Sequence, residues 1–460
     1  MSETTPLVVI LVVGLSRGML ERHAPRLAAL GRDGFIAELE PIVPAVTCSM
    51  QATLLTGELP RSHGIVANGW YFRELSEVLF WRQSNRLVQG EKVWESAKKS
   101  RPSLRTAKMF WWYNMYSSAE IAVTPRPIYP ADGRKLPSVY SRPAELGVEL
   151  QRRFGTFPLF NFWGPNADLS SSQWIADASR AVFDDERPDL TLIYLPHLDY
   201  CLQKYGPNDP RVIPEIAAID RMAAELSEHV RARGAEVVVV SEYGIEPATG
   251  VVMINRRLRE AGLLAVQETL GWELLDAGES RAFAVADHQL AHVYVREPAD
   301  ISRVAELLKR EPGIERVLDT DGKRELGLDH SRSGELVALA APGHWFSYYY
   351  WLEDARAPDF ARTVDIHRKP GYDPVELFLD PDRPLVKLHV AWTLAKKLTG
   401  FRYLMDVIPL RPELVKGTHG RLPADPNAGP VVICSNRRGG RDRLRATDFK
   451  ALLLTQLGIS

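Results

Sequence analysis

Three stretches of the chain are continuously apolar and rich in β-branched residues. Residues 7–14 read LVVILVVG, residues 191–196 read TLIYLP and residues 236–244 read EVVVVSEYG. Unbroken apolar runs of this length are typical of strands that are buried on both faces of a parallel sheet. Amphipathic segments over 171–183 and 214–234 precede the second and third runs and are expected to be helices. This alternation predicts βαβ units around a mostly parallel sheet.

The ends of these predicted strands carry small and polar residues. Gly14, residues 196–199 and residues 241–244 each follow an apolar run directly. In doubly wound α/β folds, ligands bind beyond the carboxyl ends of the parallel strands. We therefore expect the functional residues to gather at one edge of the sheet.

Residues 265–365 have a different pattern. The runs AHVYVRE, DISRVAELLKRE, IERVLD and ELVALA predict strand, helix, strand and strand in that order. This is typical of a small α+β subdomain, here inserted into a core domain that comprises residues 1–264 and 366–460. The chain then returns to the core through a predicted helix over 387–398 and a predicted strand over 429–435.

Composition and charge narrow the class of protein. The chain has 460 residues, with 45% apolar and 25% charged residues, as in ordinary globular proteins. Because 57 basic residues are balanced by 58 acidic ones, we expect no nucleic acid polymer as a partner. No apolar run approaches the roughly 20 residues of a membrane span, and the first run lacks a basic flank. We therefore expect a cytoplasmic protein, and its oligomeric state stays open.

The segment PAVTCSMQATLLTGELPRSHGIVANGWY, residues 44–71, carries the strongest candidate chemistry. An apolar segment delivers Thr47 to the start of a predicted helix, where backbone N–H groups favour an anion. Asn68 offers an amide that can donate a hydrogen bond to a phosphoryl oxygen. On spacing alone, a helix N-cap is the commoner role for a threonine in the position of Thr47.

Three further segments carry candidate functional residues. Two of them follow predicted buried strands, and the third is a glycine-rich turn near the end of the chain. In the first segment, a carboxylate and an amide at positions i and i+4 share one face of a helical turn. The residues are Asp199 and Gln203 in YLPHLDYCLQKYGP, Glu242 and Tyr243 in VVVVSEYGIEP, and His419 in VKGTHGRLP.

Together these segments resemble the nucleotide pyrophosphatase/phosphodiesterase branch of the alkaline phosphatase superfamily. The resemblance implies a doubly wound, mostly parallel α/β sheet of the alkaline phosphatase type. It also implies that Thr47 is a nucleophile, that Asn68 assists it and that divalent metal ions, typically zinc, lie beside them. The metal-binding positions of the family correspond here to Val13, Thr47, Asp199, Gln203, Glu242, Tyr243 and His419.

Four of these positions depart from the family pattern. Val13 stands where the family has a ligand aspartate, and Gln203 and Tyr243 stand where it has histidines. Glu242 replaces another aspartate, which keeps the carboxylate but adds one methylene group. An amide oxygen is a much weaker zinc ligand than an imidazole, so both expected ion sites are weakened.

The remaining ligands predict one divalent ion rather than two. Asp199 and His419 would hold the first ion, whereas the second keeps only Thr47 and Glu242 as candidates. Zinc usually takes three or four strong protein ligands. We therefore expect a single ion, zinc by resemblance, bound at Asp199 and His419.

Two other segments hold candidates for additional roles. Asp365 and His367 in TVDIHRKPGYDP lie on one face of the segment if it is extended, and they could replace missing ligands. The alternative is a polar surface turn. Trp111, Trp112 and Tyr113 in KMFWWYNMYS could line a substrate pocket, and the alternative is that they fill the core.

Two hypotheses for the function follow. The first is a metal-dependent phosphoric ester hydrolase, a phosphodiesterase rather than a monoesterase, that acts on a small phosphorylated metabolite through Thr47. The second is a pseudoenzyme that binds a phosphorylated ligand or a protein partner without hydrolysis. The retained Thr47 and Asn68 favour the first hypothesis, and the departures at Val13, Gln203 and Tyr243 favour the second.

Overall fold

The computed structural model describes residues 5–131, 134–398 and 404–459. Within these ranges, nine strands form the main sheet, and five neighbouring strands, the fourth to the eighth in spatial order, are parallel to one another. This confirms the predicted doubly wound, mostly parallel α/β sheet. In spatial order the strands are β21 (Arg443–Arg445), β2 (Phe35–Glu40), β20 (Val431–Cys434), β9 (Glu236–Val240), β1 (Leu7–Val12), β8 (Leu190–Leu195), β5 (Thr106–Met109), β6 (Ile121–Pro125) and β7 (Val139–Arg142).

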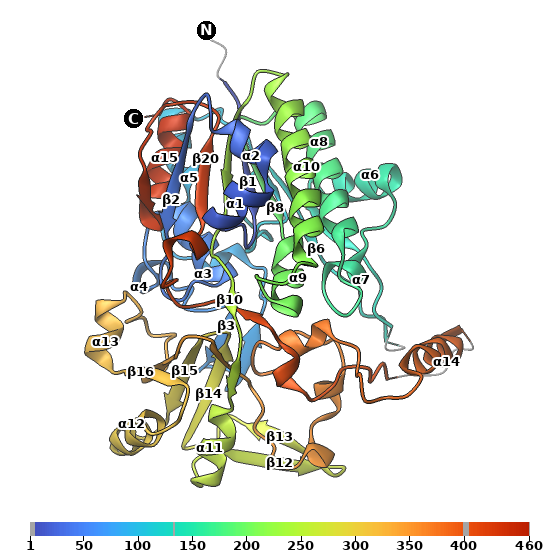
Figure 1. Cartoon of the computed structure of the whole chain (residues 1–460), viewed down its shortest axis with the longest axis vertical. Helices are drawn as coiled ribbons and strands as arrows, with labels where there is room; N and C mark the ends of the chain where they lie inside the picture. Colours follow the sequence, from blue (N-terminus) through green and yellow to red (C-terminus); the bar gives the residue numbers. More distant parts are fainter. Residues whose placement is uncertain (1–4, 132–133, 399–403, 460) are drawn as a thin grey trace.

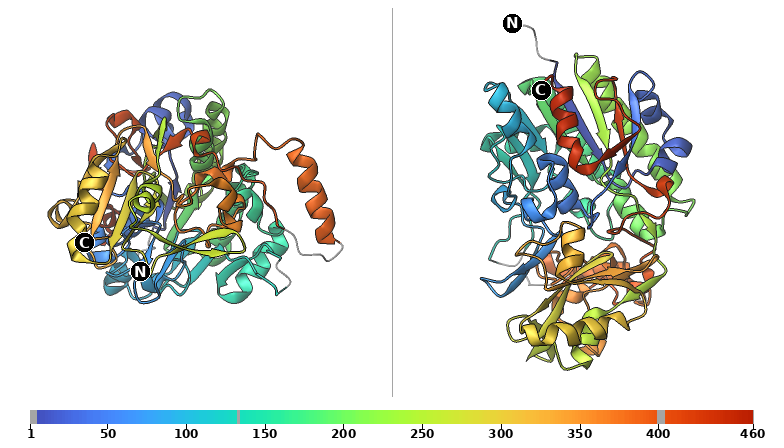
Figure 2. Two further views of the ribbon diagram at one scale, coloured as in Figure 1. Left: turned by 90° about the horizontal axis from the view of Figure 1, so that it is seen from below. Right: turned by 90° about the vertical axis from the view of Figure 1, so that its left-hand side faces the viewer.

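Helices pack against both faces of this sheet (Figures 1 and 2). On one face lie α1 (Arg17–His23), α2 (Pro25–Leu30), α8 (Leu169–Glu186) and α10 (Val212–Arg231). On the other lie α3 (Thr47–Thr56), α5 (Val93–Ser100) and α15 (Phe449–Gln456). Four further helices belong to this group, namely α4 (Pro60–His63), α6 (Ala144–Phe154), α7 (Leu159–Phe162) and α9 (His197–Tyr205). The segments predicted as helices over 171–183 and 214–234 correspond to α8 and α10.

The central strands β1, β8 and β9 are buried because their side chains are apolar on both faces. All six residues of β1 and all six of β8 are buried, as the unbroken apolar runs predict. Their registers align Val12 with Leu195 and Leu11 with Val240. The three strands therefore end together, so that the residues after each of them emerge at one edge of the sheet.

A second group of elements lies below this edge in Figure 1. Its centre is an antiparallel sheet of β14 (Ala282–Asp287), β15 (Leu290–Val295), β17 (Leu336–Ala340) and β16 (Ile314–Leu318). Around it lie α11 (Ile254–Glu260), α12 (Ile301–Lys309) and α13 (Thr320–Glu325), whereas α14 (Val386–Leu398) projects to one side, away from this sheet (Figure 1). Two-stranded pairs complete it, namely β3 (Gly69–Phe72) with β4 (Glu77–Phe80), β12 (Ala265–Thr269) with β13 (Trp272–Asp276), and β11 (Gly250–Val252) with β18 (His344–Phe346).

The four-stranded sheet falls inside the predicted insertion of residues 265–365. Its hydrophobic cluster extends further along the chain, from Val252 to Leu410, and includes Phe80 of the β3–β4 hairpin. The exact boundaries of the insertion stay a prediction. What matters for function is the β14–β15 turn, because it carries Asp287 and His288 to the edge of the main sheet.

The described helices show no membrane-crossing candidate, since none of them is both long and apolar enough. The three cysteines, Cys48, Cys201 and Cys434, are buried free thiols. Neither observation adds a functional group to the edge of the sheet.

Candidate active site

Thr47 is the first residue of helix α3, which is buried along its whole length. The N-cap of this helix is Val46, and it makes no side-chain capping bond. Thr47 therefore does not serve as the N-cap. Its hydroxyl Oγ1 lies 3.0 Å from the Oη atom of Tyr243 and the residue is 5% exposed. The side chain is thus held at a helix N-terminus, where the backbone N–H groups and the helix dipole favour an anionic ligand.

Tyr243 connects Thr47 to Asp199. Its Oη donates a hydrogen bond of 3.2 Å to Oδ1 of Asp199, from the turn that follows β9. The phenol ring is parallel to the imidazole of His419, with 3.7 Å between ring centroids and 8° between the planes. The phenol hydroxyl consequently lies between the candidate nucleophile and a buried carboxylate.

Both carboxylate oxygens of Asp199 have protein partners. Oδ1 accepts from Tyr243, and Oδ2 accepts a 2.8 Å hydrogen bond from Nε2 of Gln203, one turn later in α9. The Oε1 atom of Gln203 in turn accepts a 2.9 Å hydrogen bond from the Tyr372 hydroxyl. Burial raises the pKa of Asp199 to about 7, although the hydrogen bonds from Tyr243 and Gln203 lower it in part.

His419 completes the inner cluster. Its Nδ1 lies 2.8 Å from the carbonyl of Ala45 and therefore carries the ring proton, which it donates to that oxygen. Its Nε2 lies 3.7 Å from Oδ1 of Asp199 and makes no hydrogen bond within the described part of the chain. Burial lowers the pKa of His419 well below its ordinary value, so the imidazole is neutral at pH 7.

Asn68 is fixed beside the start of α3 by three hydrogen bonds. Its Oδ1 accepts from the backbone N–H of Cys48 at 2.9 Å, and its Nδ2 donates to Oδ1 of Asp287 at 3.1 Å. Its backbone N–H donates to Oδ2 of Asp287 at 2.7 Å. The amide therefore ties the start of α3 to the β14–β15 turn, and one of the two N–H groups of its Nδ2 is engaged by a carboxylate.

Glu242 and Val13 are buried beside this cluster. Neither carboxylate oxygen of Glu242 forms a hydrogen bond with another described residue. Burial raises the pKa of Glu242 well above its ordinary value, although the polar side chains of Gln51 and Thr47 lower it in part. Val13 is fully buried and apolar, so it has no side-chain atom that could bind an ion.

Three residues of the site carry no sequence motif, and we did not predict them. His288 stacks against Tyr372 at 3.7 Å and lies 3.8 Å from His419, between ring centroids. Asp287 binds both Asn68 and the Nδ1 atom of His288, the latter at 2.7 Å. Tyr372 does come from the polar segment TVDIHRKPGYDP that the sequence singles out, but through a different residue than expected.

Asp365 and His367 from that segment lie elsewhere. The backbone N–H of Asp365 binds Oε1 of Glu376, and Nδ1 of His367 lies 3.4 Å from the carbonyl of Phe80. Among the described contacts, none joins either side chain to Thr47. The segment reaches the site through Tyr372 and not through these two candidates.

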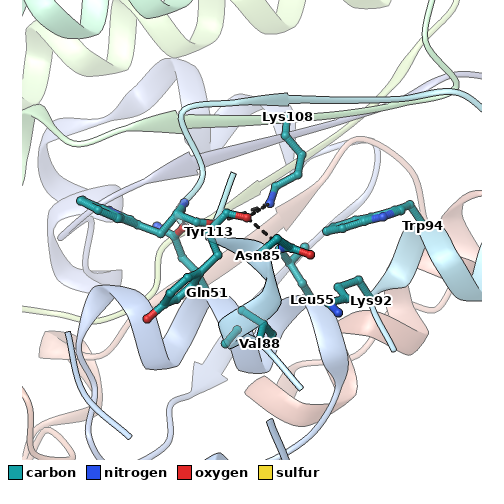
Figure 3. A pocket seen from close by; sticks show the side chains of 10 residues that line it. Gln51, Leu55, Asn85, Val88, Lys92, Trp94, Lys108 and Tyr113 are labelled. Carbon is teal, nitrogen blue, oxygen red and sulfur yellow. Dashed lines mark hydrogen bonds between the residues drawn. The ribbon is translucent and has the colours of Figure 1, made fainter. Parts of the chain in front are cut away.

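Of the three aromatic residues that could line a substrate pocket, one lies in the core and two line a small cavity. Trp111 is fully buried in the main hydrophobic cluster. Trp112 and Tyr113 line a cavity of about 10 Å³ together with Gln51 and Lys108, shown in Figure 3. A cavity of this size has room for about one water molecule and not for a metabolite.

The ligand set for two metal ions does not fit these residues. Val13 has no donor atom, Tyr243 is a phenol already bonded to Thr47 and Asp199, and both ends of the Gln203 amide are occupied. In the described ranges, no three His, Cys, Asp or Glu side chains are grouped so that they could hold one ion. What remains is the pair Asp199 and His419, which is fewer ligands than a zinc site normally needs.

Comparison with known proteins supports the resemblance seen in the sequence. The chain is 24% identical to an uncharacterised pyrophosphatase/phosphodiesterase of Schizosaccharomyces pombe over 259 residues, which cover 53% of this chain and 45% of that protein. It is 22% identical to human ectonucleotide pyrophosphatase/phosphodiesterase family member 1 over 231 residues, 48% of this chain and 21% of that protein. The chain therefore spans less than half the length of these curated relatives.

Two solved structures share the fold. Murine ectonucleotide pyrophosphatase/phosphodiesterase 5, as an inactive variant in complex with AMP, has a TM-score of 0.61 at 14% identity, covering 100% of this chain and 96% of that one. Phosphonoacetate hydrolase from Sinorhizobium meliloti 1021, in complex with phosphonoformate, has a TM-score of 0.63 at 14% identity, covering 99% and 96%. At such identity the likeness concerns the fold alone.

A family model that matches most of the chain shows to which family the chain belongs. The family model described as type I phosphodiesterase / nucleotide pyrophosphatase matches residues 7–373, which include the Thr47, Asp199 and Glu242 segments. Divalent metal ions are typical cofactors in this superfamily, so the donor set found here is a departure within it. The chain belongs to the type I phosphodiesterase / nucleotide pyrophosphatase family of the alkaline phosphatase superfamily.

Proposed function

We propose that this protein is a phosphoric ester hydrolase of the phosphodiesterase type, with Thr47 as its nucleophile and a small phosphorylated metabolite as its substrate. The observation that carries the proposal is the position of Thr47 at the buried N-terminus of α3, in hydrogen-bond contact with Tyr243. A phosphoryl group beside it would meet the positive end of a helix. The AMP and phosphonoformate complexes of the two structural neighbours make nucleotides and phosphonates the first ligands to try.

The role of Thr47 is tested with bis(4-nitrophenyl) phosphate as the diester and 4-nitrophenyl phosphate as the monoester. We expect faster turnover of the diester, and a loss of at least about 10³-fold in Thr47→Ala because the step depends on the nucleophile. Thr56→Ala is the matched control, since Thr56 is also buried in α3 and bonds only within its own helix end. Equal activity of Thr47→Ala and Thr56→Ala would refute the proposed nucleophile.

The second candidate function is ligand binding without hydrolysis. It is favoured by the departures at Val13, Gln203 and Tyr243. Gln203 and Tyr243 each donate a hydrogen bond to one carboxylate oxygen of Asp199, so both oxygens already have protein partners. In that case AMP should bind in calorimetry, Thr47→Ala should change its affinity only modestly, and neither ester should be consumed. Turnover of the diester that disappears in Thr47→Ala rejects this candidate.

Metal content is a separate part of the proposal. We propose at most one divalent ion per chain, zinc by family resemblance, with Asp199 and His419 as its only strong protein ligands. Elemental analysis of protein incubated with zinc and then desalted should give a ratio of one or below. The fourfold variant Val13→Asp, Gln203→His, Glu242→Asp and Tyr243→His restores the family pattern and should raise this ratio. A ratio of two in the parent protein would contradict the proposal.

The cytoplasmic location also stays a proposal. Fractionation of the native host, followed by detection of the protein with a specific antibody, is the test. Recovery in a membrane or extracellular fraction would contradict it.

A further inference from the structure

The hydroxyl of Tyr243 occupies the place between Thr47 and the acidic side of the site where the family pattern requires a metal-ligand histidine. We infer that Tyr243 replaces the second metal ion: in the chain without a bound ion, it positions Thr47 and accepts its proton, which passes on to Asp199. The inference rests on the proposed function, because it concerns the activation of the same nucleophile. It assigns a role to a residue that the family pattern would count only as a lost ligand.

We call the path of the proton from Thr47 through Tyr243 to Asp199 the relay, and the directions of the hydrogen bonds support it. A phenol has one proton, and Tyr243 donates it to the carboxylate oxygen Oδ1 of Asp199 at 3.2 Å. In the 3.0 Å contact with Thr47, Tyr243 must then be the acceptor and Thr47 the donor. The proton of Thr47 therefore points toward Tyr243, which leaves the lone pairs of its Oγ1 free for phosphorus.

Further contacts hold the Tyr243 and Asp199 side chains of the relay in place. The ring of Tyr243 is 1% exposed and is stacked on His419, whose Nδ1 is anchored to the backbone of α3's entry segment at Ala45. Asp199 is fixed from its other side by Gln203, and Gln203 by Tyr372. Locked side chains of this kind are what a pre-organised nucleophile requires, because little reorganisation remains at the moment of reaction.

The chemical step balances without a cofactor. The Oγ1–P bond to Thr47 forms while the bond from phosphorus to the leaving oxygen breaks. The proton of Thr47 moves to Oη of Tyr243 as the proton of Tyr243 moves to Oδ1 of Asp199, and the leaving alkoxide takes a proton from water. Water then attacks phosphorus and gives up one proton, which neutralises the hydroxide left in solution by the first step. The Thr47 ester bond breaks, and the relay returns a proton to Thr47 Oγ1 in the reverse order.

The test separates activation of Thr47 from turnover of an ester. The parent protein is treated with EDTA, desalted, and exposed to a fluorophosphonate, which phosphonylates an activated hydroxyl and releases fluoride. Intact-mass spectrometry and peptide mapping follow the labelling of Thr47. We expect labelling in the presence of EDTA, and a rate at least about tenfold lower in Tyr243→Phe, which keeps the ring but removes the acceptor oxygen.

Two further variants make the result specific. Tyr348→Phe is the matched control, because Tyr348 is also fully buried and its hydroxyl has no hydrogen-bond partner in the described structure. It should be labelled at the parental rate. Asp199→Asn interrupts the same relay, so the double variant with Tyr243→Phe should be no slower than the slower single variant. Melting curves of all variants identify any that fail to fold.

Three outcomes overturn the inference. They are labelling of the parent only after zinc is added, equal labelling of parent and Tyr243→Phe, and no labelling of Thr47 under either condition. Labelling that is independent of metal and dependent on Tyr243 supports it. If such labelling occurs while neither nitrophenyl ester is hydrolysed, the relay stands and the proposed hydrolase function fails.

Discussion

Lys108 is a single residue whose burial affects the stability of the whole protein. It is fully buried next to the cavity in Figure 3, where its Nζ donates to the carbonyl of Tyr113 at 3.1 Å and lies 5.0 Å from the ring centroid of Trp94. No carboxylate in the described contacts forms an ion pair with it. Burial therefore lowers the pKa of Lys108 to about 7.

The sign of the resulting pH dependence follows from this lowered pKa. Between pH 7 and about 10.5 the unfolded chain binds the Lys108 proton and the folded chain does not, so stability rises with pH in this window. Below pH 7 the cost of the buried charge is complete. Lys108→Met should therefore raise the free energy of unfolding by about 2–4 kcal/mol at pH 6, with the gain shrinking toward pH 10.

Urea denaturation at pH 6, 8 and 10 measures this effect. The loss of the ammonium leaves no orphaned carbonyl, because Nδ2 of Asn85 also donates to the Tyr113 oxygen at 2.8 Å. Lys309→Met, at an exposed position of α12, is the control and should show no comparable pH-dependent gain. A destabilised Lys108→Met variant at pH 6 would contradict the prediction.

At the scale of elements, the turn after β9 decides where Tyr243 lies. This turn passes so close to the segment before β20 that a Cβ atom on Gly244 would lie 1.6 Å from the carbonyl oxygen of Ala428. The clash would be between the new Cβ atom and a backbone oxygen, so it could be relieved only by displacing the turn after β9 or the segment before β20. Glycine at 244 is therefore required for the approach that brings Tyr243 to Thr47.

Gly244→Ala should lower the free energy of unfolding by more than about 3 kcal/mol and abolish the labelling of Thr47, because the clash is with backbone. Gly234→Ala is the matched control. Gly234 precedes the same strand with φ of +85° but has no atom within 4 Å of the added methyl group. Its cost should be only that of the backbone conformation, about 1 kcal/mol. Similar losses in the two variants would show that the close approach is unimportant.

At the scale of the whole molecule, one buried ion cluster holds the polar segment around Tyr372 in place. Nζ of Lys369 lies 2.7 Å from Oδ2 of Asp373 and 2.8 Å from Oε1 of Glu376, and all three side chains are buried. Glu376 also binds the indole of Trp163 at 2.5 Å, on the side of the main sheet. The cluster thus connects the two groups of elements next to the site.

Lys369→Met should lower the free energy of unfolding by about 3–5 kcal/mol, since it leaves two carboxylates buried without their cation. The effect should reach the site, because Tyr372 holds Gln203 and Gln203 holds Asp199. The triple variant with Asp373→Asn and Glu376→Gln removes the unpaired charges and should recover part of the loss. Denaturation of the single and triple variants, with the Thr47 labelling rate, checks both parts; equal stability of Lys369→Met and parent would contradict them.

The sequence by itself determined the central strands of the main sheet and the strand ends that carry the site. Apolar runs and helical periods are local properties, so β1, β8, β9, α8 and α10 follow from them directly. The resemblance at the strand ends identified Thr47, Asn68, Asp199, Glu242 and His419, and the structure brings these residues to one edge. Their catalytic and metal-binding roles remain predictions.

Only the tertiary structure decided what these residues contact. The Thr47–Tyr243 bond joins positions 196 residues apart, and the Tyr372–Gln203 bond joins positions 169 apart. No local pattern specifies such a pair, because it depends on how the β14–β15 turn and the segment around Tyr372 pack on the sheet. In the sequence, Tyr243 stands where the family has a histidine. In the folded chain its ring is buried and stacked on His419, and its hydroxyl lies within hydrogen-bond distance of Thr47.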